Sequence, residues 1–131
     1  MDNSLMTGKY MVDALNEREE ITTVLGENKI FPLIAPTDTQ YPYVIYERLM
    51  VSTQYTKIPG HDNTVQIQFR VYSDKYDEAL TIANTIRNVL ERHTLRIPNI
   101  ITINDIRLAA TSEQYTADGY LETVTFLTMV E

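Results

Sequence analysis

The sequence predicts a single α+β domain in which N-terminal helices and one long helix pack on an antiparallel or mixed β-sheet. Residues Val65 to Tyr72 alternate apolar and polar, as in a half-buried strand. The next segment, from about Asp74 to His93, carries an apolar stripe at helical spacing. A chain of 131 residues has the length of one domain, so we expect residues 1–131 to fold as a unit.

The N-terminal region predicts two short helices. Apolar residues recur at helical spacing from Leu5 to about Asn16, and a charged break at residues 17–20 follows. A second helical piece then holds Ile21, Val24 and Leu25. Gly26 is its predicted C-cap, because glycine adopts the left-handed conformation without strain.

The next segment, from Ile30 to Tyr43, is expected to be extended. It contains three of the five prolines, Pro32, Pro36 and Pro42. Each proline removes a backbone donor and disfavours helical geometry in the residue before it, so no helix fits there. The composition of residues 43–51 then predicts a strand. A polar segment over residues 52–63, with a turn at Pro59-Gly60, connects it to the alternating strand.

The long helix is predicted to begin with Ser73 or Asp74 as its cap, followed by acids in its first turn. Its apolar stripe must lie against the sheet and consists of Ala79, Ile82, Ala83, Ile86 and Leu90. Pro98 prevents any continuation.

The C-terminal third predicts strands. Ile101 and Ile103 share one phase and Ile106 and Leu108 the other, which indicates either a bulge near residues 104–105 or two short strands. Residues 110–118 are expected to form a polar connection. The last strand, residues 120–130, is apolar on both faces. Such a strand is either central and covered on both sides or exposed and paired with another subunit.

Composition argues against several classes of function. The net charge is -7, with 18 acids and 11 bases, and phosphate binding requires clustered Lys and Arg. The nearest approach to a cluster, Arg87, Arg92 and Arg96, is spread around the predicted helix end, where Arg87 and Arg92 are expected to complement the helix dipole. The absence of Cys excludes disulfides. Apolar runs are too short to span a membrane, and the N-terminus lacks the features of a signal peptide.

No catalytic, cofactor-binding or metal-binding residues are predicted. The two histidines, His61 and His93, have no Cys or carboxylate at metal-ligand spacing, and Asp62 is too close in sequence to share an ion with His61. The four glycines are isolated, so no phosphate-binding loop is expected. Nothing marks a partner for a nucleophile, and an enzyme is not expected.

Several short motifs occur in a recognisable order. They are Phe31-Pro32, the Tyr-Pro-Tyr at residues 41–43, the helix entry VYSDKYDEA at residues 71–79, and the Asp118-Gly119-Tyr120 turn. In this order and spacing, the chain resembles the tail completion proteins of long-tailed phages, also called tail terminators or tail-to-head joining proteins. The motifs are not catalytic, so the resemblance transfers no site residue.

The resemblance implies a structural role in the virion tail. Such proteins assemble in the host cytoplasm as a ring, commonly a hexamer, on the last ring of the tail tube. The ring halts tube polymerisation and presents the surface that docks to the head connector. The implied partners are therefore further copies of the chain, the tail-tube protein and the connector. DNA passes through such a ring without sequence-specific binding, and an acidic chain suits this because like charges disfavour a grip on phosphates.

Two other classes of function remain open on the sequence alone. A small-molecule or regulatory binding module of α+β type would use the same helix-on-sheet core as a ligand pocket. A hydrolase with an unrecognised site is the second. Oligomeric state separates a ring-former from a binding module, which would be monomeric or dimeric.

The nine tyrosines supply the candidate interface. Tyr43, Tyr46, Tyr72 and Tyr76 are expected at the edge of the core, with their hydroxyls in water. By contrast, Tyr55 and Tyr115 are expected in polar connections, where an exposed aromatic ring suits a protein interface. Lys57 and Ile58 precede the Pro-Gly turn beside Tyr55. The predicted interface residues are therefore Tyr55, Lys57, Ile58 and Tyr115, and the alternative for residues 55–58 is a hairpin tip without a partner.

Overall fold

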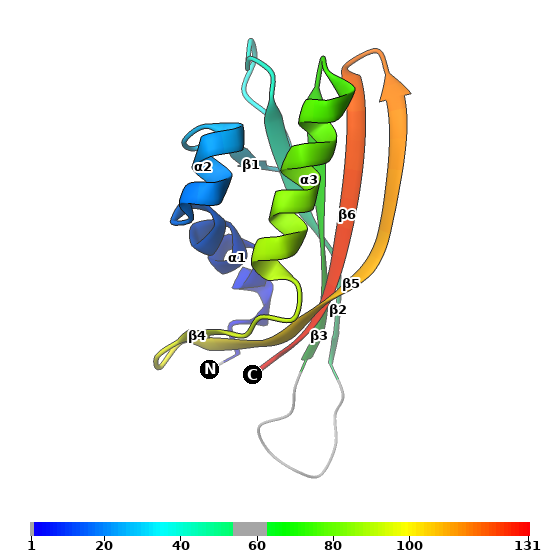
Figure 1. Cartoon of the computed structure of the whole chain (residues 1–131). Coiled ribbons are helices and arrows are strands. Elements are labelled where there is room, and N and C mark those ends of the chain that lie inside the picture. The colour runs from blue at the N-terminus through cyan, green and yellow to red at the C-terminus, as the bar shows by residue number, and fades with distance from the viewer. Residues whose placement is uncertain (1, 54–62) are drawn as a thin grey trace.

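The computed structural model describes residues 2–53 and 63–131, and it confirms the predicted α+β class (Figure 1). The elements in chain order are η1 (Ser4–Met6), α1 (Thr7–Asn16), α2 (Glu19–Leu25), β1 (Ile30–Pro32), β2 (Tyr43–Thr53), β3 (Asn63–Ser73), α3 (Tyr76–Leu90), β4 (Leu95–Ile97), β5 (Ile101–Thr116) and β6 (Gly119–Val130).

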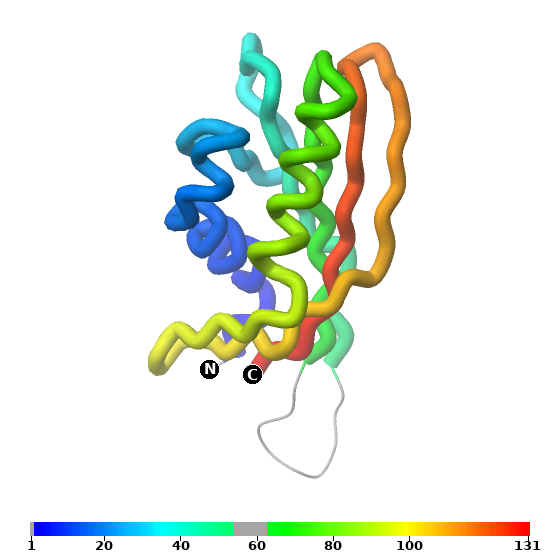
Figure 2. The backbone as a smooth tube through the Cα atoms, viewed as in Figure 1, coloured from blue at the N-terminus to red at the C-terminus, as the bar shows by residue number. Residues whose placement is uncertain are grey.

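The strands form one mixed sheet of six, in the order β1-β2-β3-β6-β5-β4. The β1–β2 pair is parallel and the other pairs are antiparallel. The three α-helices all lie on one side of this sheet (Figures 1 and 2). We call that side the covered face and the other side the open face.

The core lies between α3 and the covered face. Every residue of the predicted apolar stripe is buried, with Ile82, Ile86 and Leu90 at 0 % exposure, which confirms the predicted helix face. On the sheet, Phe69 of β3 and Phe126 of β6 meet edge to face, with ring centroids 5.9 Å apart. The N-terminal helices extend this core through Met11, Leu15 and Ile21.

Both ends of α3 lie inside the predicted span. The helix starts at Tyr76 with Lys75 as its N-cap and no side-chain capping bond, so the predicted caps, Ser73 and Asp74, are wrong. Ser73 Oγ instead accepts the Lys75 N–H and donates to the Glu78 carboxylate at 2.6 Å, which holds the turn before the helix. It ends at Leu90, and Arg92, in the left-handed region at φ 65°, reverses the chain. Gly26 follows α2 at φ 100°, as expected of its predicted capping role.

The expected polar connection over residues 110–118 is wrong. Residues up to Thr116 continue β5 and pair with β6, so only residues 117 and 118 form the turn. Thr and Ser side chains are compatible with an exposed strand, and pairing with β6 satisfies the backbone hydrogen-bonding groups of residues 110–116. The bulge predicted near residues 104–105 is confirmed by the register shift between Asn104 and Arg107.

The last strand is central. β6 pairs with β3 on one side and with β5 on the other, so it is central as one alternative predicted, but it is covered on one face and not on both. Its apolar residues nevertheless reach both faces. Phe126 is buried under α3, whereas Leu127 and Met129 lie on the open face, and Met129 is 45 % exposed.

Candidate interaction surfaces

The open face is the largest uncovered part of the sheet, and most of its side chains are uncharged. Alternation along β2, β3, β6 and β5 brings to it Tyr43, Ile45, Glu47, Met50, Ser52, Thr64, Gln66, Gln68, Arg70, Tyr72, Leu121, Thr123, Thr125, Leu127, Met129, Asn104, Arg107, Ala110, Ser112 and Gln114. Uncharged polar and apolar residues far outnumber the three charged ones, Glu47, Arg70 and Arg107, so the face can contact other surfaces without presenting a strong charge.

Both arginines that the described strands place on the open face are paired with carboxylates. Arg70 lies 2.5 Å from Glu47 on the neighbouring strand. Arg107 lies 2.9 Å from Asp105 in the β5 bulge. The face therefore offers little net positive charge to a polyanion.

Three tyrosines form a ladder at one end of the open face. The rings of Tyr41 and Tyr43 stack with centroids 5.8 Å apart, and those of Tyr43 and Tyr72 at 5.1 Å. The Tyr41 hydroxyl donates to the Asp118 carbonyl in the β5–β6 turn. Burial raises the pKa of Tyr43, in keeping with a partly covered ring. The ladder ties the chain before β2 to the β5–β6 turn.

A second group of tyrosines lies at the same end of the sheet, on the covered face. The rings of Tyr115 and Tyr120 are 4.9 Å apart, and Tyr120 meets Tyr76 of α3 at 5.8 Å. Tyr115 thus belongs to a strand and packs on a neighbour, which corrects its expected place in a loop. Its side chain is still 75 % exposed, so it remains a predicted interface residue.

Two glutamates face each other beside these tyrosines. Glu113 of β5 lies opposite Glu122 of β6, and Glu122 is only 7 % exposed. Burial, with Glu113 as a second cause, raises the pKa of Glu122 to about 7. Tyr76 donates to the Glu113 carboxylate at 2.9 Å, and this bond raises the pKa of Tyr76.

The two glutamates line a groove of about 410 Å³ between α3 and the β5–β6 hairpin. The helix contributes Leu80, Ala83, Asn84 and Arg87 to it. Arg87 is already bonded to Glu91, at 2.8 Å. Among the described residues, neither Glu113 nor Glu122 forms an ion pair.

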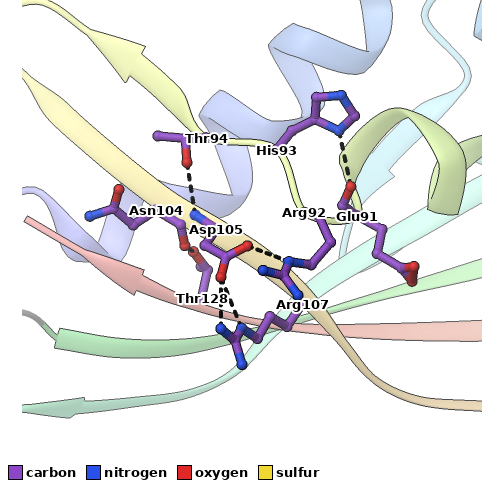
Figure 3. Close-up of polar contacts among 8 residues, drawn as sticks. All are labelled: Glu91, Arg92, His93, Thr94, Asn104, Asp105, Arg107 and Thr128. Atoms are coloured by element: carbon purple, nitrogen blue, oxygen red, sulfur yellow. Dashed lines mark hydrogen bonds and ion pairs between the residues drawn. The ribbon is translucent and has the colours of Figure 1, made fainter.

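A charged cluster at the opposite end of the molecule fixes the β5 bulge (Figure 3). Asp105 accepts from Arg92 at 2.6 Å and from Arg107 at 3.0 Å, and these two bonds, that from Arg107 first, lower its pKa. The Asp105 N–H donates to Thr94 Oγ1 at 3.0 Å, and Thr128 Oγ1 donates to the Asn104 carbonyl at 2.7 Å. The cluster joins the end of α3 to β5.

The three arginines near the end of α3 have separate surroundings. Arg87 in the last turn pairs with Glu91, whereas Arg92 lies beyond the helix and pairs with Asp105. Arg96 lies exposed on β4. Only Arg87 can complement the helix dipole as expected, and the three do not form a phosphate-binding patch.

The predicted interface residues Tyr55, Lys57 and Ile58 lie outside the described residues. Sequence reasoning missed Glu113, Glu122 and Tyr41. Each glutamate is three positions from the β5–β6 turn, Glu113 before Thr116 and Glu122 after Gly119, so the hairpin register alone would have shown that they are opposite. No signal in the sequence indicates the contact between Tyr41 and Asp118.

Residues 2–53 and 63–131 contain no group of three or more His, Cys, Asp or Glu side chains placed to hold a metal ion. None of the helices in these residues is long and apolar enough to cross a membrane. Nδ1 of the His93 ring lies 3.0 Å from the Glu91 carbonyl oxygen.

Comparisons with known proteins agree with the architecture. A chain from the virion of a native gene transfer agent (GTA) particle has the same fold, with a TM-score of 0.75 at 12 % sequence identity. The match covers 92 % of this chain and 91 % of the other. A search of curated protein sequences finds no significant match. The model of the family "Tail completion protein gp17" matches residues 9–131. The chain therefore belongs to the gp17 family of tail completion proteins, which are structural, non-enzymatic components of the phage tail.

Proposed function

We propose that the protein forms a closed ring, a hexamer of identical copies, that caps the tail tube, stops its polymerisation and provides the surface for joining to the head connector. Membership of the tail completion family over residues 9–131 carries this proposal, because it covers nearly the whole domain. The partners are then the tail-tube protein on one side of the ring and the connector on the other. Assembly takes place in the host cytoplasm, and the product resides in the virion tail.

The open face is the part of the domain best suited to line the channel of this ring. A channel for DNA must avoid holding phosphates, and clustered unpaired cations would do so. The open face presents Thr and Gln side chains and two arginines, each paired with a carboxylate. The net charge of -7 adds weak repulsion of DNA.

Family membership also favours this function over a small-molecule binding module. The groove beside Glu113 and Glu122 lies at the surface, and the domain core itself is filled by side chains such as Phe69, Phe126 and Ile82, each at 0 % exposure. A ligand pocket inside the helix-on-sheet core therefore has no support.

Capping is tested by mixing the purified protein with growing tubes of a tail-tube protein from the same phage. We expect tubes with closed ends in negative-stain images and an end to elongation at about one ring per tube end. An unrelated acidic protein of similar mass is the control. Tubes that elongate at the same rate with and without the protein would contradict the proposal.

The channel assignment is tested by DNA binding. Glu47→Gln removes the carboxylate that neutralises Arg70, so we expect this variant to retain double-stranded DNA more strongly than the parent in low-salt mobility-shift gels. Glu27→Gln changes the net charge equally at an exposed site on another part of the molecule and is the matched control. Equal retention of both variants would place the open face away from the channel.

A further inference from the structure

Two runs of strand edge in the sheet have no partner among the described residues. β4 pairs with only residues 101–103 of β5, so the outer edge of residues 109–115 is bare. At the other side of the sheet, β1 pairs with only residues 44–46 of β2, which leaves the edge of residues 47–53 bare. Each bare edge presents backbone N–H and C=O groups that can pair with another strand.

The bare edge of β5 lacks the usual protection against such pairing. Proteins commonly protect edge strands with Pro, Lys or a short length. Residues 109–115 read Ala-Ala-Thr-Ser-Glu-Gln-Tyr, are all exposed, and include one charged residue, Glu113. Residues 109–115 are therefore better suited to pairing with another strand than to exposure to solvent.

We propose that the bare edge of β5 in one copy pairs with the bare edge of β2 in the next copy, with Arg48 of the next copy bound by Glu113 and Glu122. The inference rests on the proposed ring and names the contact that joins its copies. β2 runs antiparallel to β3, β3 to β6, and β6 to β5, so β2 and β5 run in opposite directions. A copy that continues the sheet in the same orientation thus presents β2 to β5 in the antiparallel arrangement.

The charges on the two edges are complementary. Arg48 is exposed, its guanidinium donates to the Leu5 carbonyl at 3.1 Å, and it has no carboxylate partner among the described residues. Glu122 is 7 % exposed and forms no ion pair among the described residues, since Arg87 of the same groove is bonded to Glu91. A guanidinium entering the groove of about 410 Å³ would supply the charge that this carboxylate lacks.

Both sides of the proposed ion pair lie on the same face of the sheet. In the β2–β3 register, Arg48 lies opposite Ile67, a residue of the covered face at 1 % exposure. Glu113 is paired with Glu122, which in turn is opposite Val71 of the covered face. In a sheet that continues across the two copies, opposite residues point to one face, so Arg48 reaches the glutamates without rotating the strand.

The short edge strands permit this register. With Arg48 opposite Glu113, residues 47–52 of one copy lie against about residues 109–114 of the other. β1 of the next copy covers residues 44–46 of its β2, which lie level with Tyr115 and Thr116 at the end of β5 and outside this contact, and β4 lies beyond the other end of the contact. Neither short strand occupies the edge that the pairing needs.

The same register is compatible with a closed sheet. Within one copy, the ladder aligns Arg48 with Ile67, Ile67 with Phe126, and Phe126 with Leu108. Glu113 is five residues after Leu108, and the bulge after Leu108 takes up one of these five. Placing Arg48 of the next copy beside Glu113 therefore shifts the strand register by about four residues over the four strand spacings from one β2 to the next. That is about one residue, or ~3.3 Å, for each strand spacing of ~4.8 Å, which tilts the strands by about 35°, at the lower end of the range in closed barrels.

The pairing is tested by disulfide trapping, since the protein has no Cys of its own. The variant Arg48→Cys/Glu113→Cys carries both residues in one chain, where two strands, β3 and β6, separate them and an internal bridge cannot form. On oxidation at high concentration we expect a ladder of covalent oligomers on non-reducing gels. Arg96→Cys/Glu113→Cys is the control, because Arg96 is an exposed arginine on β4, away from the contact. We expect at least about tenfold less dimer from it.

Charge exchange tests the ion pair. Arg48→Glu and Glu113→Arg should each weaken self-association at least about tenfold in sedimentation equilibrium, and the two changes together should restore most of it. Tyr76→Phe removes the hydrogen bond to Glu113 without changing its charge and should leave association unchanged.

The outcomes separate this inference from the proposed function. Capped tubes with no cross-linking above the control would overturn the β5–β2 contact and leave the ring in place. Cross-linked ladders without capping would support the contact and overturn the capping function. A chain that neither cross-links nor caps overturns both.

Discussion

Glu113 and Glu122 lie opposite each other across the β5–β6 hairpin, and the second of them is 7 % exposed. The charged or titratable groups around Glu122 are Glu113 on β5 and Arg87 and Tyr76 on α3. Arg87 is bonded to Glu91, and the Tyr76 hydroxyl is bonded to Glu113. A subunit by itself therefore holds a buried carboxyl group without a cation, and this has measurable consequences for stability.

Stability of the free subunit should fall as pH rises from about 4.5 to about 7. Burial raises the pKa of Glu122 from 4.5 to about 7, so in this window the folded state binds a proton that the unfolded chain has released. We expect Glu122→Gln to remove much of this loss and to be more stable than the parent at pH 8, by on the order of 2 kcal/mol. Chemical denaturation at several pH values measures it, with Glu27→Gln as control. A parallel pH dependence in Glu122→Gln and the parent would contradict the assignment.

A charge on the buried face of α3 should unfold the domain. Ile82 is fully buried, and Ile82→Asp would place an unpaired carboxylate against the sheet at a cost of several kcal/mol, comparable with a total stability of about 5 to 15 kcal/mol. Thr81→Asp adds the same charge one residue away at an exposed position. Circular dichroism and thermal melts should show an unfolded first variant and a near-native second one. Two folded variants would mean that the helix face is misassigned.

Gly119 should tolerate a side chain less well than Gly26. Both have positive φ, 108° and 100° respectively, so alanine is strained at either site. At Gly119 the added Cβ would also lie 2.6 Å from the Ser73 carbonyl oxygen, whereas at Gly26 it meets only the Lys29 side chain at 3.6 Å. We expect Gly119→Ala to cost at least about 1 kcal/mol more than Gly26→Ala in urea denaturation. Equal losses would show that the β5–β6 turn moves away from β3 at little cost.

Tyr115 should matter for assembly more than for folding. Tyr115 is 75 % exposed and its ring packs on that of Tyr120, so Tyr115→Ser should change the free energy of unfolding by only about 1 kcal/mol. An interface aromatic that fills a pocket contributes about 2 kcal/mol or more, so tube capping should weaken markedly. Tyr55→Ser/Ile58→Ser tests the other predicted interface residues in the same assay. Capping at parental concentrations by both variants would place the interface elsewhere.

Periodicity in the sequence determined the elements in which buried and exposed side chains recur at regular spacing. The stripe of Ala79, Ile82 and Ile86 predicted which face of α3 is buried, because burial of a helix repeats every three to four residues. Alternation of Val65, Ile67 and Phe69 predicted β3 in the same way. The motif order around residues 31–43 and 71–79 was sufficient to indicate the family that the family model then showed.

Only the tertiary structure decided which segments pair as strands and which side chains this pairing brings together. Residues 110–116 are polar and read as a connection, yet they form a strand because β6 satisfies their backbone groups. The same pairing brings Glu113 to Glu122 and Tyr115 to Tyr120. The described helices lie on one face of the sheet, which leaves the other face open, and the shortness of β1 and β4 leaves two strand edges bare. Periodicity within one segment does not specify which strand pairs with it or in which register.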